Sequence, residues 1–189
     1  MIIGLCGAQG SGKDTVANIL VSKYGFIRIS FATALKDVVA ILFSWPREML
    51  EGDTPESRTW REAPDAEWSL KTGIAEFSPR KALQMVGTDL IRTHIYANLW
   101  IDIVEKQIAT ILSANPKAKI VVSDCRFTNE VAAIKKTPGA RLVQILRQER
   151  ESGTHLSETA DLSAGVDITL INNNTIEALE ISLGVVIDH

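Results

Sequence analysis

The first fifteen residues constrain this chain more than any other stretch. They begin with a short apolar run, residues 2–6 (IIGLC), which is long enough for a buried parallel strand. The run leads directly into residues 7–15, which read GAQGSGKDT. A glycine, four further residues and then Gly-Lys is the spacing of the phosphate-binding P-loop. The apolar helical pattern that follows, with Val16, Ile19 and Leu20 on one face, is the context that this motif requires.

Each residue type in the motif serves the binding of phosphate groups. Glycines at positions 7, 10 and 12 permit backbone conformations that side chains would prevent, so successive N–H groups converge on an anion. Lys13 adds a positive charge within reach of the β- and γ-phosphates of a nucleotide. The positive end of the following helix faces the same phosphates.

Position 14 departs from the usual motif. It is Asp14, where P-loops generally carry the Ser or Thr that binds Mg²⁺, and Thr15 comes one residue later. We therefore predict that the metal is held differently, with Asp14 acting directly or through a water molecule.

Short apolar strands alternate with amphipathic helices along the chain. The strands are predicted at 2–6, 26–30, 119–124, 141–147 and 166–171. This alternation predicts an α/β fold with a five-stranded parallel sheet and helices on both faces. We expect the whole chain, 1–189, to form one such domain.

Two segments stand apart from this alternation. Residues 44–99 are predicted to form a helical insertion, and residues 147–164 a short polar segment beyond the fourth strand. Within the insertion, residues 44–78 hold three of the four tryptophans and carry eight acidic against four basic side chains. We expect short helices joined by turns there.

A helix is predicted to begin at Ser78-Pro79, a cap followed by proline at the first position. Its predicted buried stripe consists of Leu83, Val86 and Leu90. Its predicted polar stripe, at spacings of three and four, consists of Lys81, Gln84, Thr88 and Arg92. Gly87 in the middle costs roughly 1 kcal/mol against alanine, which indicates a close approach to the backbone. The polar stripe suits either solvent or a nucleoside monophosphate.

Charged residues follow the predicted strand ends, the edge at which open α/β sheets bind ligands. Asp124 ends an apolar strand and can there reach Mg²⁺ or its waters. Arg126 follows at the start of the next helix. Arg147 and Arg150 lie past the fourth strand, where phosphoryl transfer needs positive charge over the γ-phosphate. Lys36, one turn past a strand end, is either solvated surface or a ligand contact.

Composition narrows the class of protein. The chain is 46% hydrophobic and 23% charged, as in ordinary globular proteins. A net charge of −3 argues against a nucleic-acid polymer as partner but suits a small phosphorylated ligand. The sequence contains no run of eighteen apolar residues, so it predicts no membrane-spanning helix. Cys6 and Cys125 adjoin predicted core strands, which favours reduced thiols in a cytoplasmic protein.

With these residues in place, the chain resembles the deoxynucleoside monophosphate kinases of bacteriophages over nearly its whole length. The segments that carry the resemblance are 7–15, 30–32 with 35–36, 50–53, 82–84 with 87–89, 124–127 with 129–130, and 155–158. The most specific are the Lys-Asp-Thr ending of the P-loop and the Asp-x-Arg-Phe block at 124–127.

The resemblance implies a three-layer P-loop kinase fold, with residues 44–99 as an acceptor-binding insertion and residues 147–164 as a short lid. It also implies transfer of the γ-phosphoryl group of ATP to a dNMP, with Mg²⁺ as cofactor, giving dNDP and ADP. The residues it assigns to catalysis are Lys13, Asp14, Asp124, Arg126, Arg147 and Arg150. Those assigned to ATP are Gly10, Ser11, Gly12, Lys13, Asp14, Thr15 and Arg147. Those assigned to the acceptor are Lys36, Gln84, Thr88, Asp89, Arg92 and Arg126. Those assigned to the metal are Asp14, Thr15 and Asp124. A phage enzyme of this kind would act in the host cytoplasm, and a homodimer is among its candidate assemblies.

Two other interpretations stay open at this point. The Lys-Asp pair of the P-loop and the block at 155–158 also resemble animal-type phosphomevalonate kinases, whose acceptor is not a nucleotide. A GTP-dependent switch is the alternative from another class. Against it, the chain lacks an Asn-Lys-x-Asp guanine motif and an Asp-x-x-Gly after the third strand.

Overall fold

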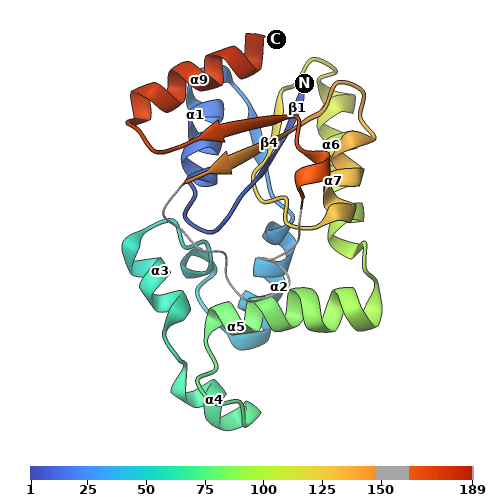
Figure 1. Ribbon diagram of the computed structural model, residues 1–189. Coiled ribbons are helices and arrows are strands. Elements are labelled where there is room, and N and C mark those ends of the chain that lie inside the picture. The colour runs from blue at the N-terminus through green and yellow to red at the C-terminus, as the bar shows by residue number, and fades with distance from the viewer. Residues whose placement is uncertain (148–161, 189) are drawn as a thin grey trace. The chain divides into compact units, whose positions relative to one another are not determined.

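The computed structural model describes residues 1–147 and 162–188, which divide into two compact units (Figure 1). Unit 1 comprises Met1–Phe31 and Ile101–His189, and unit 2 comprises Ala32–Trp100. The predicted insertion, 44–99, lies within unit 2. The predicted lid segment, 147–164, lies largely outside the described residues. None of the helices in residues 1–147 and 162–188 combines the length and the apolar composition of a membrane span.

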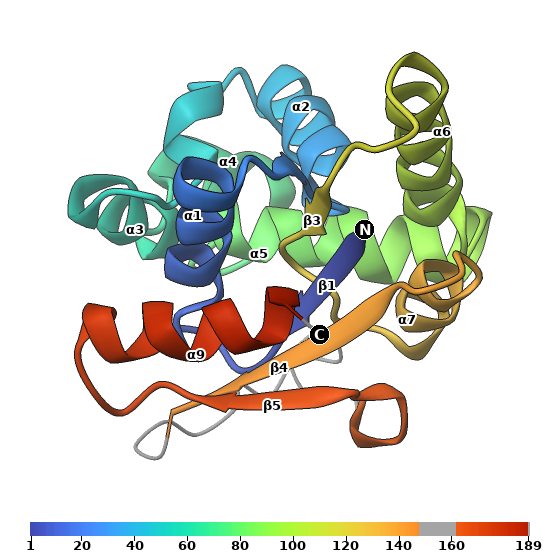
Figure 2. The same ribbon diagram turned by 90° about the horizontal axis from the view of Figure 1, so that it is seen from above.

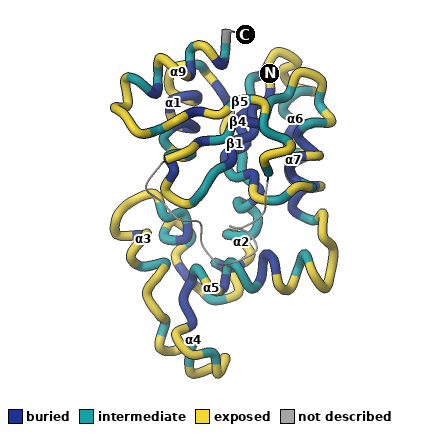
Figure 3. Tube along the Cα trace, in the orientation of Figure 1, coloured by how far each residue is buried: buried dark blue, intermediate teal, exposed yellow. Residues whose placement is uncertain are grey.

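Unit 1 is built on a five-stranded sheet with the order β2-β3-β1-β4-β5, and every pairing in it is parallel. The strands are β1 (Ile2–Cys6), β2 (Ile27–Ile29), β3 (Ile120–Val122), β4 (Arg141–Leu146) and β5 (Ile168–Ile171). All five residues of β1 are buried, as Figure 3 shows for the centre of the sheet. The predicted α/β fold and its five strands are confirmed.

Helices cover both faces of this sheet (Figures 1 and 2). The helices on one face are α1 (Lys13–Tyr24) and α9 (Ile176–Asp188), and those on the other are α6 (Leu99–Ala114) and α7 (Thr128–Lys135). Ile3 and Leu5 of β1 belong to the core that α1 and α9 close. Gly4 faces the opposite way, since a Cβ there would meet Cys125 and Ile134. Alternate residues of β1 therefore supply two separate cores.

Unit 2 is helical and has a core of its own. Its elements are α2 (Ala32–Phe43), η1 (Arg47–Leu50), α3 (Pro55–Glu62), α4 (Ala66–Thr72), α5 (Pro79–Gln84) and η2 (Met85–Ile95). Its buried core residues are Val39, Trp45, Leu50, Phe77, Ala82 and Val86. Phe43 stacks on Trp45 with ring centroids 4.6 Å apart and meets Trp68 edge-on at 4.9 Å. The tryptophan-rich stretch thus supplies a packed interior.

The helix that begins at Ser78 starts as predicted but does not continue as an α-helix. The Ser78 hydroxyl accepts a hydrogen bond from Lys81 N at 3.3 Å. From Met85 onward the helix is a π-helix, in which hydrogen bonds join residues five apart and the turn is wider than in an α-helix. The predicted stripes are therefore wrong in phase beyond α5, since Thr88 is buried and Leu90 is 46% exposed.

Gly87 confirms the close approach that its position predicted. A Cβ at Gly87 would lie 2.5 Å from Cδ2 of Leu35 in α2. The Gly87 carbonyl accepts a hydrogen bond from the indole Nε1 of Trp100 at 3.1 Å. The groups that approach this backbone are thus side chains of unit 2 itself, and they account for the glycine.

Candidate functional site

The loop between β1 and α1 forms a glycine-lined cradle. Gly7 has φ 141°, Gly10 72° and Gly12 107°, values that favour glycine. A Cβ at Gly7 would lie 2.3 Å from the Ile145 carbonyl oxygen of β4, so a side chain is excluded there by contact as well. The loop closes on itself through a hydrogen bond from Ser11 N to Ala8 O at 3.2 Å. The predicted role of the glycines in shaping this loop is confirmed.

The amino end of α1 completes the cradle. Gly12 is the cap residue of this twelve-residue helix, and no side chain of the described residues makes a capping hydrogen bond there. The first N–H groups of a helix have no partner within the helix, and its dipole favours an anion at this end. The loop and helix together fit a phosphate group.

Lys13 extends across its own loop. Its Nζ donates to Gly7 O at 2.7 Å and to Ala8 O at 2.8 Å. Burial lowers the pKa of Lys13 to about 8, and the positive charge of Arg126 acts in the same direction. The negative charge of Asp124 is among those that oppose this shift. The ammonium is therefore mostly charged at neutral pH, in surroundings that leave it under-solvated.

Asp124 lies at the carboxyl end of β3, as predicted, and is held by two donors. Its Oδ2 accepts from Ser30 Oγ at 2.7 Å, and its Oδ1 accepts from Phe31 N at 2.9 Å. Both donors follow β2, so the carboxylate ties the ends of two neighbouring strands together. A carboxylate oxygen has more than one acceptor site, so Asp124 can still receive a metal ion or its water molecules.

The backbone of Arg126 is held by hydrogen bonds to Glu130, a residue for which the sequence analysis predicted no role. Glu130, only 1% exposed, accepts from Arg126 N at 2.7 Å and from Phe127 N at 3.2 Å. The Arg126 residue itself is exposed. Glu130 is the third residue of α7, a position from which a carboxylate can reach back to the N–H groups before the helix. The cap residue is Phe127 rather than the Ser or Thr that usually marks this arrangement in a sequence.

Asp14 is paired with Arg28 of β2, which the sequence analysis missed. The Arg28 Nη2 lies 2.5 Å from Asp14 Oδ1, and the Asp14 side chain is 76% exposed. Arg28 also donates to Asn18 Oδ1 and to Ser123 Oγ, each at 3.1 Å. One guanidinium thus joins α1 to the end of β3. In the sequence, a single arginine in a short strand indicates a side chain exposed to solvent. The pairing of Arg28 with Asp14 is therefore visible only in the folded structure.

The remaining catalytic candidates differ in how far the structure describes them. Thr15 lies half-buried in the first turn of α1. Arg147 directly follows β4 and is exposed. Arg150 and the block at 155–158 lie outside the described residues. Their predicted roles stay predictions.

Most acceptor candidates lie in unit 2, and Lys36 is already engaged there. Its ammonium pairs with Glu51, which also pairs with Arg47. Arg47 in turn contacts Asp37, with Nε 2.5 Å from Oδ1. Burial alone would raise the pKa of Glu51, but the hydrogen bonds and charges of Lys36 and Arg47 outweigh it and lower the pKa. This charged cluster was not predicted.

The candidates of α5 and η2 differ in accessibility. Gln84 is half-buried, Thr88 is buried and Asp89 is exposed. Arg92 is half-buried, and its Nη1 donates to Ala97 O at 3.3 Å. The π-helical spacing separates these residues differently from the predicted stripe, and their role toward an acceptor stays a prediction.

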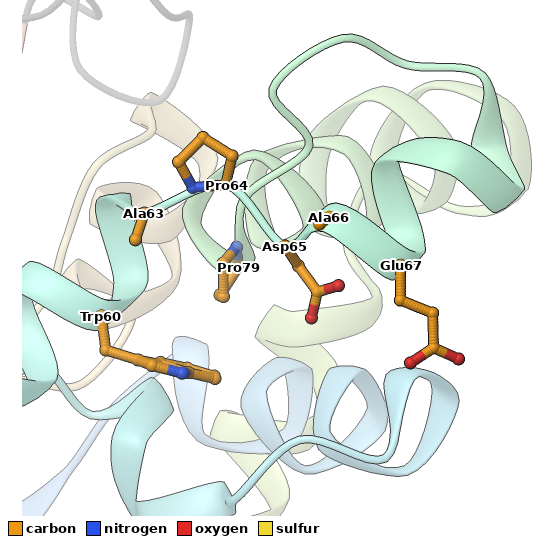
Figure 4. Close-up of a pocket in the computed structure, with 7 residues that line it drawn as sticks. All are labelled: Trp60, Ala63, Pro64, Asp65, Ala66, Glu67 and Pro79. Carbon is orange, nitrogen blue, oxygen red and sulfur yellow. The ribbon is translucent and has the colours of Figure 1, made fainter.

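Unit 2 also contains a cavity of about 380 Å³. Its lining residues, drawn in Figure 4, are Trp60, Ala63, Pro64, Asp65, Ala66, Glu67 and Pro79. Both carboxylate oxygens of Asp65 have partners at 2.9 Å, Trp45 Nε1 and Trp68 N, and Glu67 pairs with Lys71. None of the predicted site residues lines this cavity, and we assign it no binding role.

A parallel α/β sheet with a glycine-lined loop, its lysine and an uncapped helix start defines the class of P-loop nucleotide-binding proteins. The crystal structure of TT1252 from Thermus thermophilus has a similar fold, with a TM-score of 0.54 and 20% identity, over 100% of this chain and 96% of that one.

The family follows from the sequence comparison. A family model described as deoxynucleotide monophosphate kinase matches residues 65–183. A protein of Acanthamoeba polyphaga mimivirus, provisionally named a deoxynucleotide monophosphate kinase, is 38% identical over 94% of this chain and 91% of its own length. The deoxynucleoside-5'-monophosphate kinase of Escherichia phage T5 is 26% identical over 72% of each chain. The chain belongs to the deoxynucleotide monophosphate kinase family, as the resemblance predicted.

Proposed function

We propose that this protein transfers the γ-phosphoryl group of ATP to deoxynucleoside monophosphates. The observation that carries the proposal is the phosphate cradle around Lys13, found in a chain of this kinase family. An oxygen of the dNMP phosphate forms the new bond to the γ-phosphorus while the bond from that phosphorus to the β–γ bridging oxygen breaks. The products are dNDP and ADP. Family membership favours this acceptor over phosphomevalonate and over a switch without an acceptor.

The chain's own groups would act chiefly by position and charge, which is what phosphoryl transfer requires. The N–H groups of the loop and the Lys13 ammonium would hold the ATP phosphates. The guanidinium groups of Arg126, Arg147 and Arg150 would offset the negative charge shared by donor and acceptor. The acceptor nucleotide would be held by Lys36, Gln84, Thr88, Asp89 and Arg92.

Thr15, Asp124 and Asp14 are the residues that would hold Mg²⁺ or its water molecules. Mg²⁺ is usually bound by one or two carboxylates together with substrate phosphates and waters. The fixed carboxylate of Asp124 suits this, and no group of three or more His, Cys, Asp or Glu side chains gathers for a metal among the described residues. When bound, the ion neutralises phosphate charge.

We place the reaction in the cytoplasm, or in the host cytoplasm if the gene is viral. The free thiols of Cys6 and Cys125, both buried, support a reducing compartment.

The proposal is tested by measuring ADP release from ATP·Mg²⁺ with a panel of acceptors. The panel contains the four dNMPs, a hydroxymethylated pyrimidine dNMP, the ribonucleoside monophosphates and phosphomevalonate. We expect stimulation by several dNMPs. If phosphomevalonate alone stimulates release, or if hydrolysis is slow and independent of any acceptor, the proposal is wrong.

Arg92→Ala is expected to raise the KM for dNMP by about tenfold or more, because it removes a charge-assisted hydrogen bond to the acceptor. The KM for ATP should change little. Arg80→Ala is the matched control, since Arg80 belongs to the preceding helix and pairs with Glu62 at 2.9 Å. Steady-state kinetics with each substrate varied gives both constants. An equal rise in both KM values for Arg92→Ala would contradict acceptor binding by this residue.

Asp14→Asn and Arg28→Gln are expected to shift the Mg²⁺ requirement in opposite directions. If the Asp14 carboxylate attracts the ion, its neutralisation raises the half-saturating Mg²⁺ concentration, while loss of Arg28 unmasks the carboxylate and lowers it. A charge change near a partly exposed site corresponds to about threefold to tenfold. The measurement is ATP turnover against Mg²⁺ concentration at saturating substrates. Shifts in the same direction would show that the pair serves only to join α1 to the sheet.

A further inference from the structure

The turn that follows β5 contacts the phosphate-binding loop through one side chain. The Nδ2 of Asn172 donates to the Ser11 carbonyl oxygen at 2.8 Å, across 161 positions of sequence. The Asn172 backbone is itself anchored, because its N–H donates to Leu146 O at the end of β4 at 2.7 Å. Asn172 therefore joins the loop to the edge of the sheet.

The contact is close enough to exclude any side chain on the next loop residue. A Cβ at Gly12 would lie 2.2 Å from Asn172 Nδ2. Gly12 also has φ 107°, which favours glycine independently of the available space. The absence of a Cβ at Gly12 thus lets the Asn172 amide reach the Ser11 carbonyl.

This hydrogen bond fixes the orientation of a whole peptide unit. In a trans peptide, the carbonyl of one residue and the N–H of the next point in opposite directions. Because the Ser11 carbonyl points at Asn172, the Gly12 N–H points away from it. Gly12 is the cap residue of α1, where N–H groups are available to an anion. A rotation of this peptide would replace a donor by a carbonyl oxygen, which repels phosphate.

We propose that Asn172 is a positioning residue of the phosphate-binding loop, which orients the Ser11–Gly12 peptide so that the Gly12 N–H faces the phosphates of the bound nucleotide. This inference rests on the proposed binding of ATP at this loop. It assigns to Asn172 an action through the backbone, without contact to the base or ribose of the nucleotide.

The test compares Asn172→Asp with Asn174→Asp in the full-length protein. Both variants add one negative charge to the same turn, but only the first replaces the amide donor by a carboxylate that repels the Ser11 carbonyl. Asn172→Ala removes the donor without adding charge, and it carries the test if Asn172→Asp fails to fold. The ligands are ATP·Mg²⁺ and inorganic tripolyphosphate with Mg²⁺, which has no base or sugar, and calorimetric titration gives each Kd.

We expect Asn172→Asp to weaken the binding of both ligands by about tenfold or more, and Asn172→Ala by about threefold to tenfold. Asn174→Asp should stay within about twofold of the wild type, and the KM for dNMP should be unchanged in all three variants. The thermal midpoint should fall by no more than roughly 4 °C, as for the loss of a single hydrogen bond, which separates this effect from unfolding.

Three results would overturn the inference. They are equal losses in Asn172→Asp and Asn174→Asp, unchanged binding in Asn172→Ala, and weakened ATP binding with unchanged tripolyphosphate binding. The last result would place Asn172 against the base or ribose. A wild-type protein that binds tripolyphosphate but phosphorylates no dNMP would refute the proposed function, while the binding comparison would still decide the role of Asn172.

Discussion

Lys13→Ala is expected to lower kcat/KM for ATP by about a thousandfold or more while the protein stays folded. Loss of one preorganised donor at a developing charge costs about 10²–10³ in rate, and this variant also removes a full positive charge from the site. The variant is measured by ADP release with saturating dNMP. Near-normal turnover by Lys13→Ala would show that catalysis does not depend on the phosphate-binding loop.

The stability of Lys13→Ala follows from the sign of the pKa shift. The folded-state pKa of Lys13, about 8, is below its ordinary value of 10.5, so the fold disfavours the charged form. At pH 7 Lys13 is charged in the folded protein, so its burial lowers the free energy of unfolding. This free energy rises as the pH increases from about 8 to 10.5, because the folded protein loses the proton first. Removing the charge therefore should not lower the thermal midpoint at pH 7. Lys23→Ala, which breaks a surface pair with Glu180 at the other end of α1, is the control for both activity and stability.

The same lysine gives the wild-type enzyme a pH signature. The pH dependence of kcat/KM reports the ionisation of groups in the free enzyme. We expect kcat/KM for ATP to fall as the pH rises through about 8, where Lys13 loses its proton. Lys13→Ala should lack this decline in its residual activity.

Asp124→Asn is expected to lower kcat by about a hundredfold to a thousandfold and to destabilise the fold by about 1–3 kcal/mol. The carboxylate accepts from two donors, Ser30 Oγ and Phe31 N. An amide has only one acceptor oxygen, so its NH₂ group would face one of these donors. The variant also removes the negative charge that would attract Mg²⁺. Turnover and denaturant unfolding measure the two effects separately.

Asp167→Asn is the matched control for Asp124→Asn. The Asp167 carboxylate also accepts a backbone N–H from a neighbouring strand, that of Leu142 at 2.6 Å, and it pairs with Lys135. Asp167 lies at the amino ends of the strands, just before β5 and beside the start of β4, whereas Asp124 lies beyond the carboxyl end of β3. We expect this variant to lose stability with unchanged kcat. If both variants lose activity in proportion to stability, Asp124 acts only as a structural tie.

The sequence predicted those features that depend on neighbouring residues. The strands are short apolar runs, and the glycines and lysine of the loop are fixed by spacing within one motif. Asp124 was predictable because strand ends of a parallel sheet meet at one edge. The start of α5 was predictable because Ser78 and Pro79 act within a single turn.

The features that were missed depend on residues far apart in the chain. Arg28 acquires its role only when β2 lies beside α1 and β3, and Asn172 only when β5 brings it to the loop. Lys36 was predicted to be either solvated surface or a ligand contact, and its ion pair with Glu51, which Arg47 shares, forms only when the chain folds. The π-helix could not be predicted, because the spacing of three and four in the sequence indicates an α-helix. Within the π-helix, Gly87 packs against Leu35 and accepts a hydrogen bond from Trp100, both of which are distant in sequence.

The division of unit 1 into two chain segments sets an order for folding during synthesis. Unit 2 is one continuous segment and is complete once Trp100 has been made, before β3, β4 or β5 exists. Its contacts are local, and such contacts form early. The wholly apolar β1 has to wait for β3 and β4, its two partners, which lie more than a hundred residues further along. A nascent chain therefore carries a folded helical unit next to an unpaired hydrophobic strand, and the ribosome-bound stage is when this protein most needs protection from aggregation.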